Sequence, residues 1–309
     1  MKTEDFICQW MNEQQLVLQR STYEALTIYV YRHILPYITE RCPELSQISA
    51  ATLQSYVLDK LHNGRIDGKG GLSPVSVRKH LSVIKQMLDE AVRLGYIPVN
   101  PAFSVKMPRN RDVHERMVFL TAEEAQKMLD ALKDTKIYPA VVLALYYGLR
   151  RSEVLGLRWS AVDFERDTIT ICHTVVKSLT VEAKDTTKTS TSRRAFQLLP
   201  EVKKMLLSFR GDKVESDYLF VNEDGKVLRP DCLTRTFQRG LKRAGLPRMR
   251  FHDLRHTTAS VLFDSGWSLE DVKNWLGHAD IETTSNIYLH YGRDRKILLA
   301  DELSGMFRI

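Results

Sequence analysis

The first hundred residues show the hydrophobic spacing of amphipathic helices. In the stretch STYEALTIYVYRHILPYI, apolar or aromatic side chains recur every three or four positions, and Ser21 and Glu24 have the spacing of a capping box. The stretch ATLQSYVLDKL has the same period. A glycine-rich loop then precedes Ser73 and Pro74, which are typical of a helix start, and further apolar repeats follow them. This part of the chain is therefore predicted to be helical.

Beyond these repeats the helical pattern gives way to a stretch with mixed charge. The sequence YIPVNPAFSVKMPRNRDVHERMV contains three prolines, and this composition predicts an extended linker. We expect a helical domain at residues 1–108, a linker at residues 109–118 and a second domain at residues 119–309.

The second domain combines helical patterns with a few strand patterns. Thr121 and Glu124 have capping-box spacing ahead of an amphipathic repeat, and YPAVVLALYYG is apolar on all sides, which indicates a buried helix. TITICHTVV, SLTVEA and RRAFQLL have the composition of strands. After Leu199 the pattern is helical again, apart from DYLFVN. The predicted fold class is mainly α, with a small antiparallel sheet in the second domain.

Length and composition agree with two globular domains. A chain of 309 residues is longer than one hydrophobic core usually supports. No apolar run approaches the roughly 18 residues that a membrane span needs, and the beginning MKTEDFICQW lacks the pattern of a secretory signal, so a soluble cytoplasmic protein is expected. The cysteines are too scattered to predict a disulfide framework or a zinc site; they are Cys8, Cys42, Cys172 and Cys232.

The charge of the chain favours a polyanionic partner. Lys and Arg number 45 against 38 Asp and Glu, which gives a formal net charge of +7. The basic excess is present in both halves of the chain, as expected if both contact the same partner.

Two segments of the second domain each place a basic residue where it could bind a phosphate. In YGLRRSEVLGLRW, Arg150 follows a glycine just where a helix is predicted to start, and helix starts favour anions. The alternative for Arg150 is a surface pair with Glu153. In TTKTSTSRRAFQL, Lys188 lies in a polar turn, where a lysine is often simply solvated.

Two later segments carry histidines, an arginine and a tyrosine at short spacing. FHDLRH contains His252, Arg255 and His256, and WLGHADIETTSNIYLHY contains His278 and Tyr288. Because His252 lies one helical turn before Arg255, both side chains are predicted on one face. A lone tyrosine in such a helix is more often a packing residue than a nucleophile.

Taken together and in this order, the segments resemble those of the tyrosine recombinase, or phage integrase, family. YGLR resembles the family's T-G-x-R motif, with Tyr147 at its first position, and TKTSTSRR resembles its lysine hairpin. HDLRH resembles its His-x-x-Arg box, and LGHADIETTSNIY its final box, which ends in the nucleophile. The resemblance covers residues 119–291. More loosely, the helical first hundred residues resemble the family's SAM-like core-site-binding domain.

The resemblance implies a site-specific recombinase or integrase that cleaves and rejoins DNA through a 3′-phosphotyrosine intermediate. Two arginines would neutralise the phosphate, a lysine would protonate the 5′ oxygen, histidines would bind the phosphate or the attacking group, and a tyrosine would attack. The residues expected to be catalytic are Arg150, Lys188, His252, Arg255, His278 and Tyr288. Glu153 and His256 are expected to support them from behind, and no metal or nucleotide cofactor is implied.

The resemblance also implies the partners. They are double-stranded DNA recombination sites, three further copies of the chain in a tetramer on DNA with a Holliday-junction intermediate, and an accessory excisionase or DNA-bending protein; no membrane is implied. The apolar C-terminal tail RDRKILLADELSGMFRI is predicted to dock on a neighbouring protomer. A phage or mobile-element integrase is favoured, and an Xer-like chromosome or plasmid resolvase is the alternative.

Two other functions stay open from the residues alone. His252 and His256 have the spacing of the zinc ligands in H-E-x-x-H metalloproteases, with Asp253 where the general-base glutamate would be. A DNA-binding regulator without catalysis would explain the charge and the helices, but would leave the Lys188 and Tyr288 segments unexplained.

Overall fold

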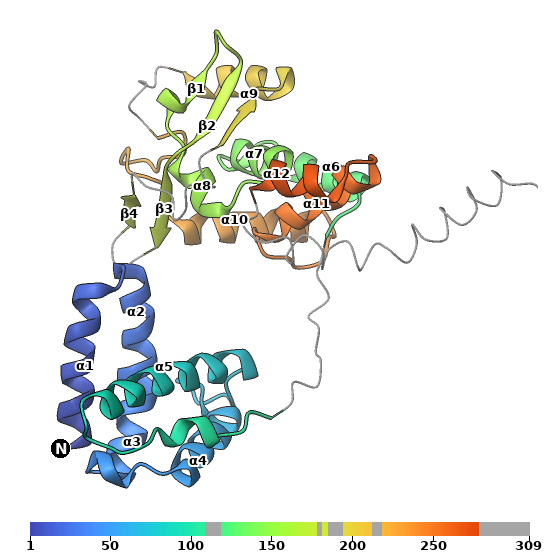
Figure 1. Cartoon of the computed structure of the whole chain (residues 1–309). Coiled ribbons are helices and arrows are strands. Elements are labelled where there is room, and N and C mark those ends of the chain that lie inside the picture. Colours follow the sequence, from blue (N-terminus) through green and yellow to red (C-terminus); the bar gives the residue numbers. More distant parts are fainter. Residues whose placement is uncertain (109–118, 178–180, 185–193, 212–217, 278–309) are drawn as a thin grey trace, which may run out of the picture. The chain divides into compact units, whose positions relative to one another are not determined.

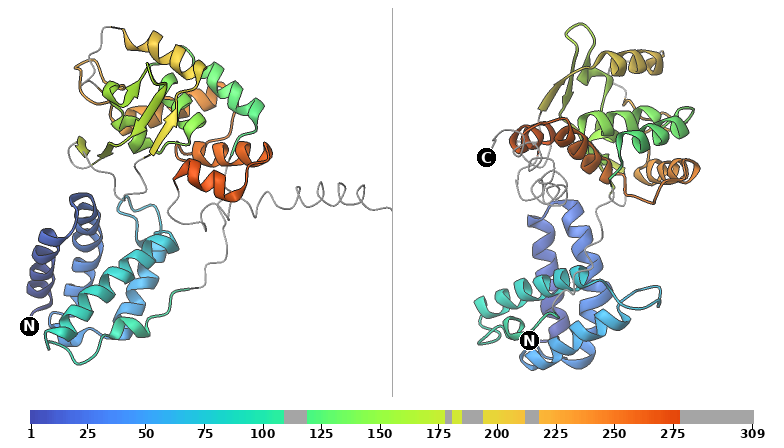
Figure 2. Two further views of the ribbon diagram at one scale, coloured as in Figure 1. Left: turned by 45° about the horizontal axis from the view of Figure 1, so that its top comes forward. Right: turned by 90° about the vertical axis from the view of Figure 1, so that its right-hand side faces the viewer.

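The structure is a computed structural model that describes residues 1–108, 119–177, 181–184, 194–211 and 218–277 (Figures 1 and 2). The chain divides into two compact units, Met1–His114 and Glu115–Ile309, and each has its own hydrophobic core. The expected linker at residues 109–118 lies outside the described residues, so domain boundaries at residues 108 and 119 remain a prediction.

The N-terminal unit consists of helices around one apolar core. At the start of α5, Ser73 accepts a hydrogen bond from the backbone N–H of Ser76, and Pro74 occupies the first turn, as the sequence predicts. The helical elements are α1 (Thr3–Val17), α2 (Arg20–Tyr29), the π turn η1 (Val30–Ile34), α3 (Leu35–Arg41), the 3₁₀ turn η2 (Leu45–Gln47), α4 (Ala50–Asn63), α5 (Pro74–Arg93) and the 3₁₀ turn η3 (Pro101–Ser104).

Three expectations for this unit are wrong in detail. Ser21 is not an N-cap, because α2 begins at Arg20 and is preceded by a residue without a side-chain cap. The apolar repeat that continues to Ile38 is interrupted by η1 just before Pro36, since proline has no N–H to continue the α-helical hydrogen bonds. The stretch predicted to be extended contains η3, whose Ala102 is fully buried in the core.

The helices of the second unit include both of those that the sequence predicts most clearly. Thr121 and Glu124 form a reciprocal capping box at the start of α6, and α7 is buried along most of its length. The helical elements are α6 (Ala122–Leu132), α7 (Tyr138–Tyr147), α8 (Arg151–Gly156), the 3₁₀ turn η4 (Trp159–Ala161), α9 (Pro200–Arg210), α10 (Pro230–Arg243), α11 (Asp253–Asp264) and α12 (Leu269–Leu276).

The strands of this unit form two small antiparallel groups. In the first group β2 lies between β1 and β5, with Ile169 opposite Phe196. In the second, β3 pairs with β4. The strands are β1 (Val162–Asp163), β2 (Thr168–Ile171), β3 (Thr174–Lys177), β4 (Val181–Lys184) and β5 (Arg194–Gln197). The predicted small antiparallel sheet is confirmed.

The single strand predicted over TITICHTVV is wrong, because the chain leaves the first sheet after Ile171. It then passes against α8, where β3 packs. The approach is so close that a Cβ on Gly156 would lie 2.6 Å from the carbonyl oxygen of His173. Tertiary packing against α8 therefore divides one apolar run into two strands.

The core of the second unit places α7 at the centre of the elements that carry the predicted site. The helix α7 packs against α6, α8, α9 and α11 (Figure 1). Thr258 on α11 donates a hydrogen bond to the carbonyl oxygen of Leu145 on α7 at 2.7 Å, which joins the two helices directly. In the described part of the chain, none of the helices has the length and apolar character of a membrane span.

Candidate active site

The turn between α7 and α8 places Arg150 at the beginning of a helix. The helix α7 ends at Gly148, which has a φ of +60°, and Arg150 is the residue that precedes the first turn of α8. A Cβ on Gly148 would lie 2.2 Å from Cδ2 of Leu276, so both the backbone conformation and the close approach of α12 require glycine here. The sequence prediction that Arg150 stands at a helix start is confirmed.

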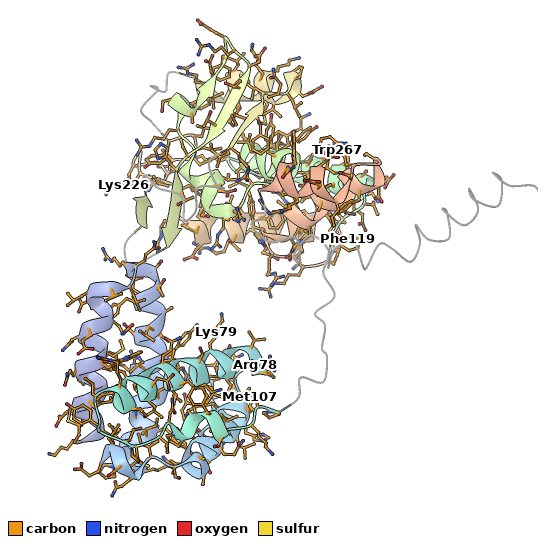
Figure 3. All side chains as sticks on the ribbon, in the orientation of Figure 1. Arg78, Lys79, Met107, Phe119, Lys226 and Trp267 are labelled. Atoms are coloured by element: carbon orange, nitrogen blue, oxygen red, sulfur yellow. The ribbon has the colours of Figure 1, made fainter. Side chains whose placement is uncertain are left out.

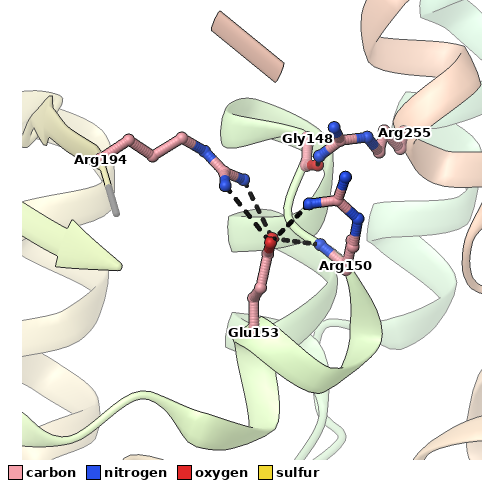
Figure 4. Close-up of polar contacts among 5 residues, drawn as sticks. All are labelled: Gly148, Arg150, Glu153, Arg194 and Arg255. Atoms are coloured by element: carbon pink, nitrogen blue, oxygen red, sulfur yellow. Dashed lines mark hydrogen bonds and ion pairs between the residues drawn. The ribbon is translucent and has the colours of Figure 1, made fainter. Parts of the chain in front are cut away.

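Glu153 fixes Arg150 through both its backbone and its side chain. One carboxylate oxygen of Glu153 accepts from the backbone N–H of Arg150 at 2.8 Å, and the other accepts from its guanidinium at 2.7 Å (Figure 4). The pair is not the surface ion pair that the sequence left open, because the Glu153 side chain is only 2% exposed while that of Arg150 is 33% exposed. Glu153 therefore holds the arginine from behind and leaves part of the guanidinium accessible.

A second arginine binds the same carboxylate. Arg194, on β5, donates to the two carboxylate oxygens of Glu153 at 3.2 and 2.9 Å (Figure 4). Burial raises the pKa of Glu153, but the charge and hydrogen bonds of Arg194, followed by those of Arg150, outweigh burial and leave the pKa below its usual value. Glu153 is thus ionised at neutral pH and shared between two guanidinium groups.

Arg255 lies beside this group, buried on α11. Its side chain is 1% exposed, and it donates a hydrogen bond to the carbonyl oxygen of Gly148 at 2.8 Å. Figure 4 shows the guanidinium groups of Arg255 and Arg150 close together beside Gly148. Burial lowers the pKa of Arg255 to about 9, and repulsion by Arg150 adds to this effect, so the side chain is still charged at neutral pH.

The histidines of the FHDLRH segment lie at the start of α11. His252 immediately precedes the helix, and its ring packs edge-on against that of His256, with 5.6 Å between the ring centroids. Loss of solvation lowers the pKa of His252 to about 4, with further contributions from His256, Arg255 and Arg150. The His252 side chain is exposed at the surface, but neighbouring groups displace much of the water around its ring, and this loss of water lowers the pKa. A ligand can therefore reach a neutral imidazole.

His256 is the buried member of the pair, with 8% of its surface exposed. Burial lowers its pKa, and Arg250 and Arg255 oppose the effect of the nearby Asp253 carboxylate. Within the described part of the chain, its buried Nδ1 atom has no hydrogen-bond partner. His256 is thus the more buried ring of the pair and packs against His252, and its supporting role stays a prediction.

Asp253 has a structural role that the sequence did not reveal. It is 4% exposed, and its carboxylate accepts from the backbone N–H of Arg250 at 2.7 Å and from the guanidinium of the same residue at 3.1 Å. The carboxylate is thereby engaged by Arg250 at the start of α11. Among the described residues, no group of three or more His, Cys, Asp or Glu side chains has the arrangement of a metal site.

The expected site residues therefore fall into two sets. Arg150, Glu153, His252, Arg255 and His256 come together from α8 and α11 around the end of α7. The other set lies outside the described residues and consists of Lys188, His278 and Tyr288.

Arg194 is the residue of the site that sequence reasoning missed. It is the last residue of TKTSTSRR and also belongs to the strand pattern RRAFQLL. The signal was strand alternation: Arg194 shares a face of β5 with the buried Phe196 and pairs with the buried Ile171. An arginine at an inward strand position requires a buried acidic partner, which here is Glu153.

Comparisons with known proteins agree with this arrangement. Residues 118–294 match the model of the family described as "Phage integrase family", and residues 4–106 match that of the "Phage integrase SAM-like domain". A tyrosine recombinase XerC-like protein of Caldanaerobacter subterraneus subsp. tengcongensis is 28% identical over 98% of this chain and 83% of its own length. Tyrosine recombinase XerC of Chlamydia muridarum is 30% identical over 74% of this chain and 70% of its own.

A solved structure shows the same fold. The integrase of the Tn1549 transposon, in complex with transposon right end DNA, aligns with a TM-score of 0.74 at 20% identity, over 97% of this chain and 100% of that one. The mainly helical fold with a small antiparallel sheet and an N-terminal SAM-like domain is that of the tyrosine recombinases. The chain belongs to the phage integrase family and is a site-specific recombinase.

Proposed function

We propose that this chain binds double-stranded DNA recombination sites and cleaves and rejoins them through a covalent 3′-phosphotyrosine at Tyr288. The observation that carries the proposal is the excess of positive charge around Glu153. Among the described residues, the guanidinium groups of Arg150, Arg194 and Arg255 surround or adjoin this one buried carboxylate, and Arg150 retains an accessible face. Such a site suits an anion with several oxygens, such as a phosphodiester.

The reaction is a transfer of the phosphoryl group between two oxygens. The hydroxyl of Tyr288 attacks the scissile phosphorus and gives its proton to the neutral imidazole of His252; a bond forms between the tyrosine oxygen and phosphorus, and the bond from phosphorus to the 5′ oxygen breaks. Lys188 donates a proton to the departing 5′ oxygen. Religation reverses these steps with another 5′ hydroxyl as the attacking group, so the bond energy is conserved and the scheme has no place for a nucleotide cofactor.

The other residues stabilise the charge on the phosphate. Arg150 and Arg255 neutralise the non-bridging oxygens, and the neutral ring of His252 exchanges hydrogen bonds with the phosphate or the attacking group. His278 donates to a phosphate oxygen. Glu153 and His256 do not contact DNA in this scheme; they hold Arg150 and His252 in place.

A basic hollow on α10 supports contact with the DNA backbone near this site. The hollow has a volume of roughly 650 Å³, and its lining includes four exposed basic residues: Arg235, Arg239, Lys242 and Arg248. Arg151, the neighbour of Arg150, donates to the hydroxyl of Thr234 on α10 at 3.0 Å, which connects α8 to the helix that lines the hollow. A DNA backbone whose phosphates bind along α10 would therefore extend toward Arg150 and Arg255.

The N-terminal unit would supply further contacts. Figure 3 shows Arg78 and Lys79 on α5, and both side chains are exposed. We propose that residues 1–108 form a core-site-binding domain, that residues 109–118 connect it to the catalytic domain, and that both domains bind the same duplex. Contact by two domains provides more phosphate contacts than either domain provides alone.

We further propose that the chain acts as a homotetramer on two DNA sites, through a Holliday junction, and that an accessory excisionase or DNA-bending protein controls direction. The transposon integrase among the structural relatives supports a phage or mobile-element source, whereas the curated relatives named XerC keep an Xer-like resolvase as the alternative. The C-terminal tail, which lies outside the described residues, would link neighbouring protomers.

The proposal is tested with DNA that contains the recombination site and a nick that traps the covalent product. Covalently trapped DNA selected from a random library supplies the site. Wild-type protein should form an adduct on a denaturing gel, with the phosphate on Tyr288 by mass spectrometry and a free 5′ hydroxyl on the released strand. Tyr288→Phe should bind the DNA but form no adduct. Tyr146→Phe, which alters an exposed tyrosine of α7, is the matched control and should react as wild type. An undiminished adduct in Tyr288→Phe contradicts the assignment.

A further inference from the structure

Arg194 is largely buried in the second unit, Glu115–Ile309, and is oriented by two different contacts. Its side chain is 10% exposed, and its guanidinium carbon lies 5.4 Å from the ring centroid of Phe196, two residues along β5. Its Nη1 and Nη2 atoms donate to different oxygens of Glu153. Both the plane of the guanidinium and the plane of the carboxylate are thereby fixed, as expected for a bidentate pair.

The same side chain lies against the end of α12. Gly277 ends this helix with a φ of +66°, and a Cβ placed on it would lie 3.2 Å from Cδ and 3.3 Å from Nη1 of Arg194. In addition, Trp275 of α12 packs edge-on against Phe196, with ring centroids 5.0 Å apart. Arg194 therefore touches α8 through Glu153, and α12 through Gly277.

The charges explain why this contact matters to Arg150. Glu153 binds the backbone and the guanidinium of Arg150 with the same two oxygens that Arg194 occupies. Without Arg194, Arg150 would be the remaining guanidinium that hydrogen-bonds the buried carboxylate, because Arg255 lies nearby but donates to Gly148. The carboxylate could then rotate, and it would draw the positive charge of Arg150 inward, away from the accessible side of the site.

We propose that Arg194 is a positioning residue for the recombinase reaction, because it fixes the Glu153 carboxylate so that Arg150 is aimed at the scissile phosphate. It acts through Glu153 and does not contact DNA. The inference rests on the proposed function, since it assigns Arg150 to the phosphate.

The test compares Arg194→Gln with a matched variant of the same unit. Arg158→Gln also removes a guanidinium, one that donates to the hydroxyl of Tyr218 at 2.9 Å and lies over the ring of that tyrosine. Each protein is incubated with saturating nicked site DNA, well below its melting temperature. We expect Arg194→Gln to cleave on the order of 100-fold more slowly, with DNA affinity changed by less than about threefold, because misplacement of a catalytic group lowers the rate more than binding. Arg158→Gln should lose thermal stability but cleave at the wild-type rate.

A conservative variant and a double variant separate positioning from general damage. Arg194→Lys keeps the charge but cannot bind both oxygens in one plane, so we expect a loss of roughly tenfold. If Arg194 acts through Glu153, the double variant Arg194→Gln with Glu153→Gln should be no slower than the slower single variant. Multiplicative losses in the double variant, or wild-type rates in Arg194→Gln or Arg194→Lys, overturn the inference.

Should Arg194→Gln fail to fold, Arg194→Lys and the double variant still supply the rates. Failure of the two proposals is distinguishable. Wild-type protein that forms no adduct on site DNA refutes the phosphotyrosine mechanism, whereas a wild-type adduct with unchanged rates in the Arg194 variants refutes the positioning role alone.

Discussion

The guanidinium of Arg255 donates a hydrogen bond to the carbonyl oxygen of Gly148, 107 residues earlier in the chain and 2.8 Å away. This contact joins the turn that presents Arg150 to the helix that follows His252. It holds only if the backbone at Gly148 keeps its left-handed conformation, which aims the carbonyl at α11. The position of a glycine thus determines how two predicted catalytic segments meet.

The first prediction concerns this glycine. Gly148→Ala should lower the free energy of unfolding of the second unit by about 2–5 kcal/mol, because a φ of +60° is unfavourable for alanine and the new Cβ would lie 2.2 Å from Leu276. Urea unfolding measures the loss. Gly225→Ala is the matched control, since Gly225 has a φ of +72° with nothing within 4 Å of the added Cβ, and it should lose only about 1 kcal/mol. Equal losses in the two variants would contradict the steric argument.

The second prediction concerns a buried histidine pair in the N-terminal unit. His80 is 1% exposed. Its Nδ1 atom shares a hydrogen bond of 2.9 Å with the hydroxyl of Tyr56, and its ring packs against that of His33. Burial lowers the pKa of His80 to about 4, with repulsion by His33 and Lys60 adding to this, and burial lowers the pKa of His33 as well.

The sign of the pH effect follows from these shifts. Above pH 6.5 His80 is neutral in both the folded and the unfolded chain; between pH 6.5 and about 4 the unfolded chain binds a proton that the folded chain does not. The contribution of neutral His80 to the free energy of unfolding is therefore fully present above pH 6.5. It decreases by roughly 3 kcal/mol as the pH falls toward 4. Urea unfolding at pH 7.5 and pH 5 measures the difference. His80→Gln should reduce it, while His62→Gln, at an exposed position of α4, should leave it unchanged.

The third prediction concerns the basic hollow on α10. Arg239→Gln should weaken DNA binding and reduce the slope of log affinity against log salt by about 0.9, the value for one lost phosphate contact. Arg166→Gln removes a highly exposed arginine between β1 and β2 and should leave the slope unchanged. Fluorescence anisotropy at several salt concentrations makes the comparison. If both variants have the wild-type slope, α10 is not part of the DNA interface.

The fourth prediction separates the recombinase from a zinc enzyme. Because the proposed mechanism neutralises the phosphate with Arg150 and Arg255, excess EDTA should leave the rate of DNA cleavage unchanged. The rate is measured on nicked site DNA before and after chelation, with zinc added back as a control. Cleavage that is lost with EDTA and restored by zinc would assign His252 and His256 to a metal instead.

The sequence by itself determined the protein class, the helical character of both units, and those elements whose signals are local. The capping box of Thr121 and Glu124, the start of α5 at Pro74 and the buried helix α7 all depend on residues within a few positions of one another. The placement of Arg150 at a helix start also followed from neighbouring residues, since Gly148 ends one helix directly before the next. Local backbone preferences are sufficient for such features.

Only the tertiary structure decided how the site is supported. Glu153 and Arg194 are 41 residues apart, and no local pattern pairs them. The pair forms because the folded second unit brings β5 next to α8, and because a buried carboxylate needs a cation. Packing against α8 likewise divides TITICHTVV into two strands, although its composition is that of one. Side-chain pattern predicts which face of an element is buried, but the partner that covers this face comes from distant parts of the chain, and only the folded structure brings them together.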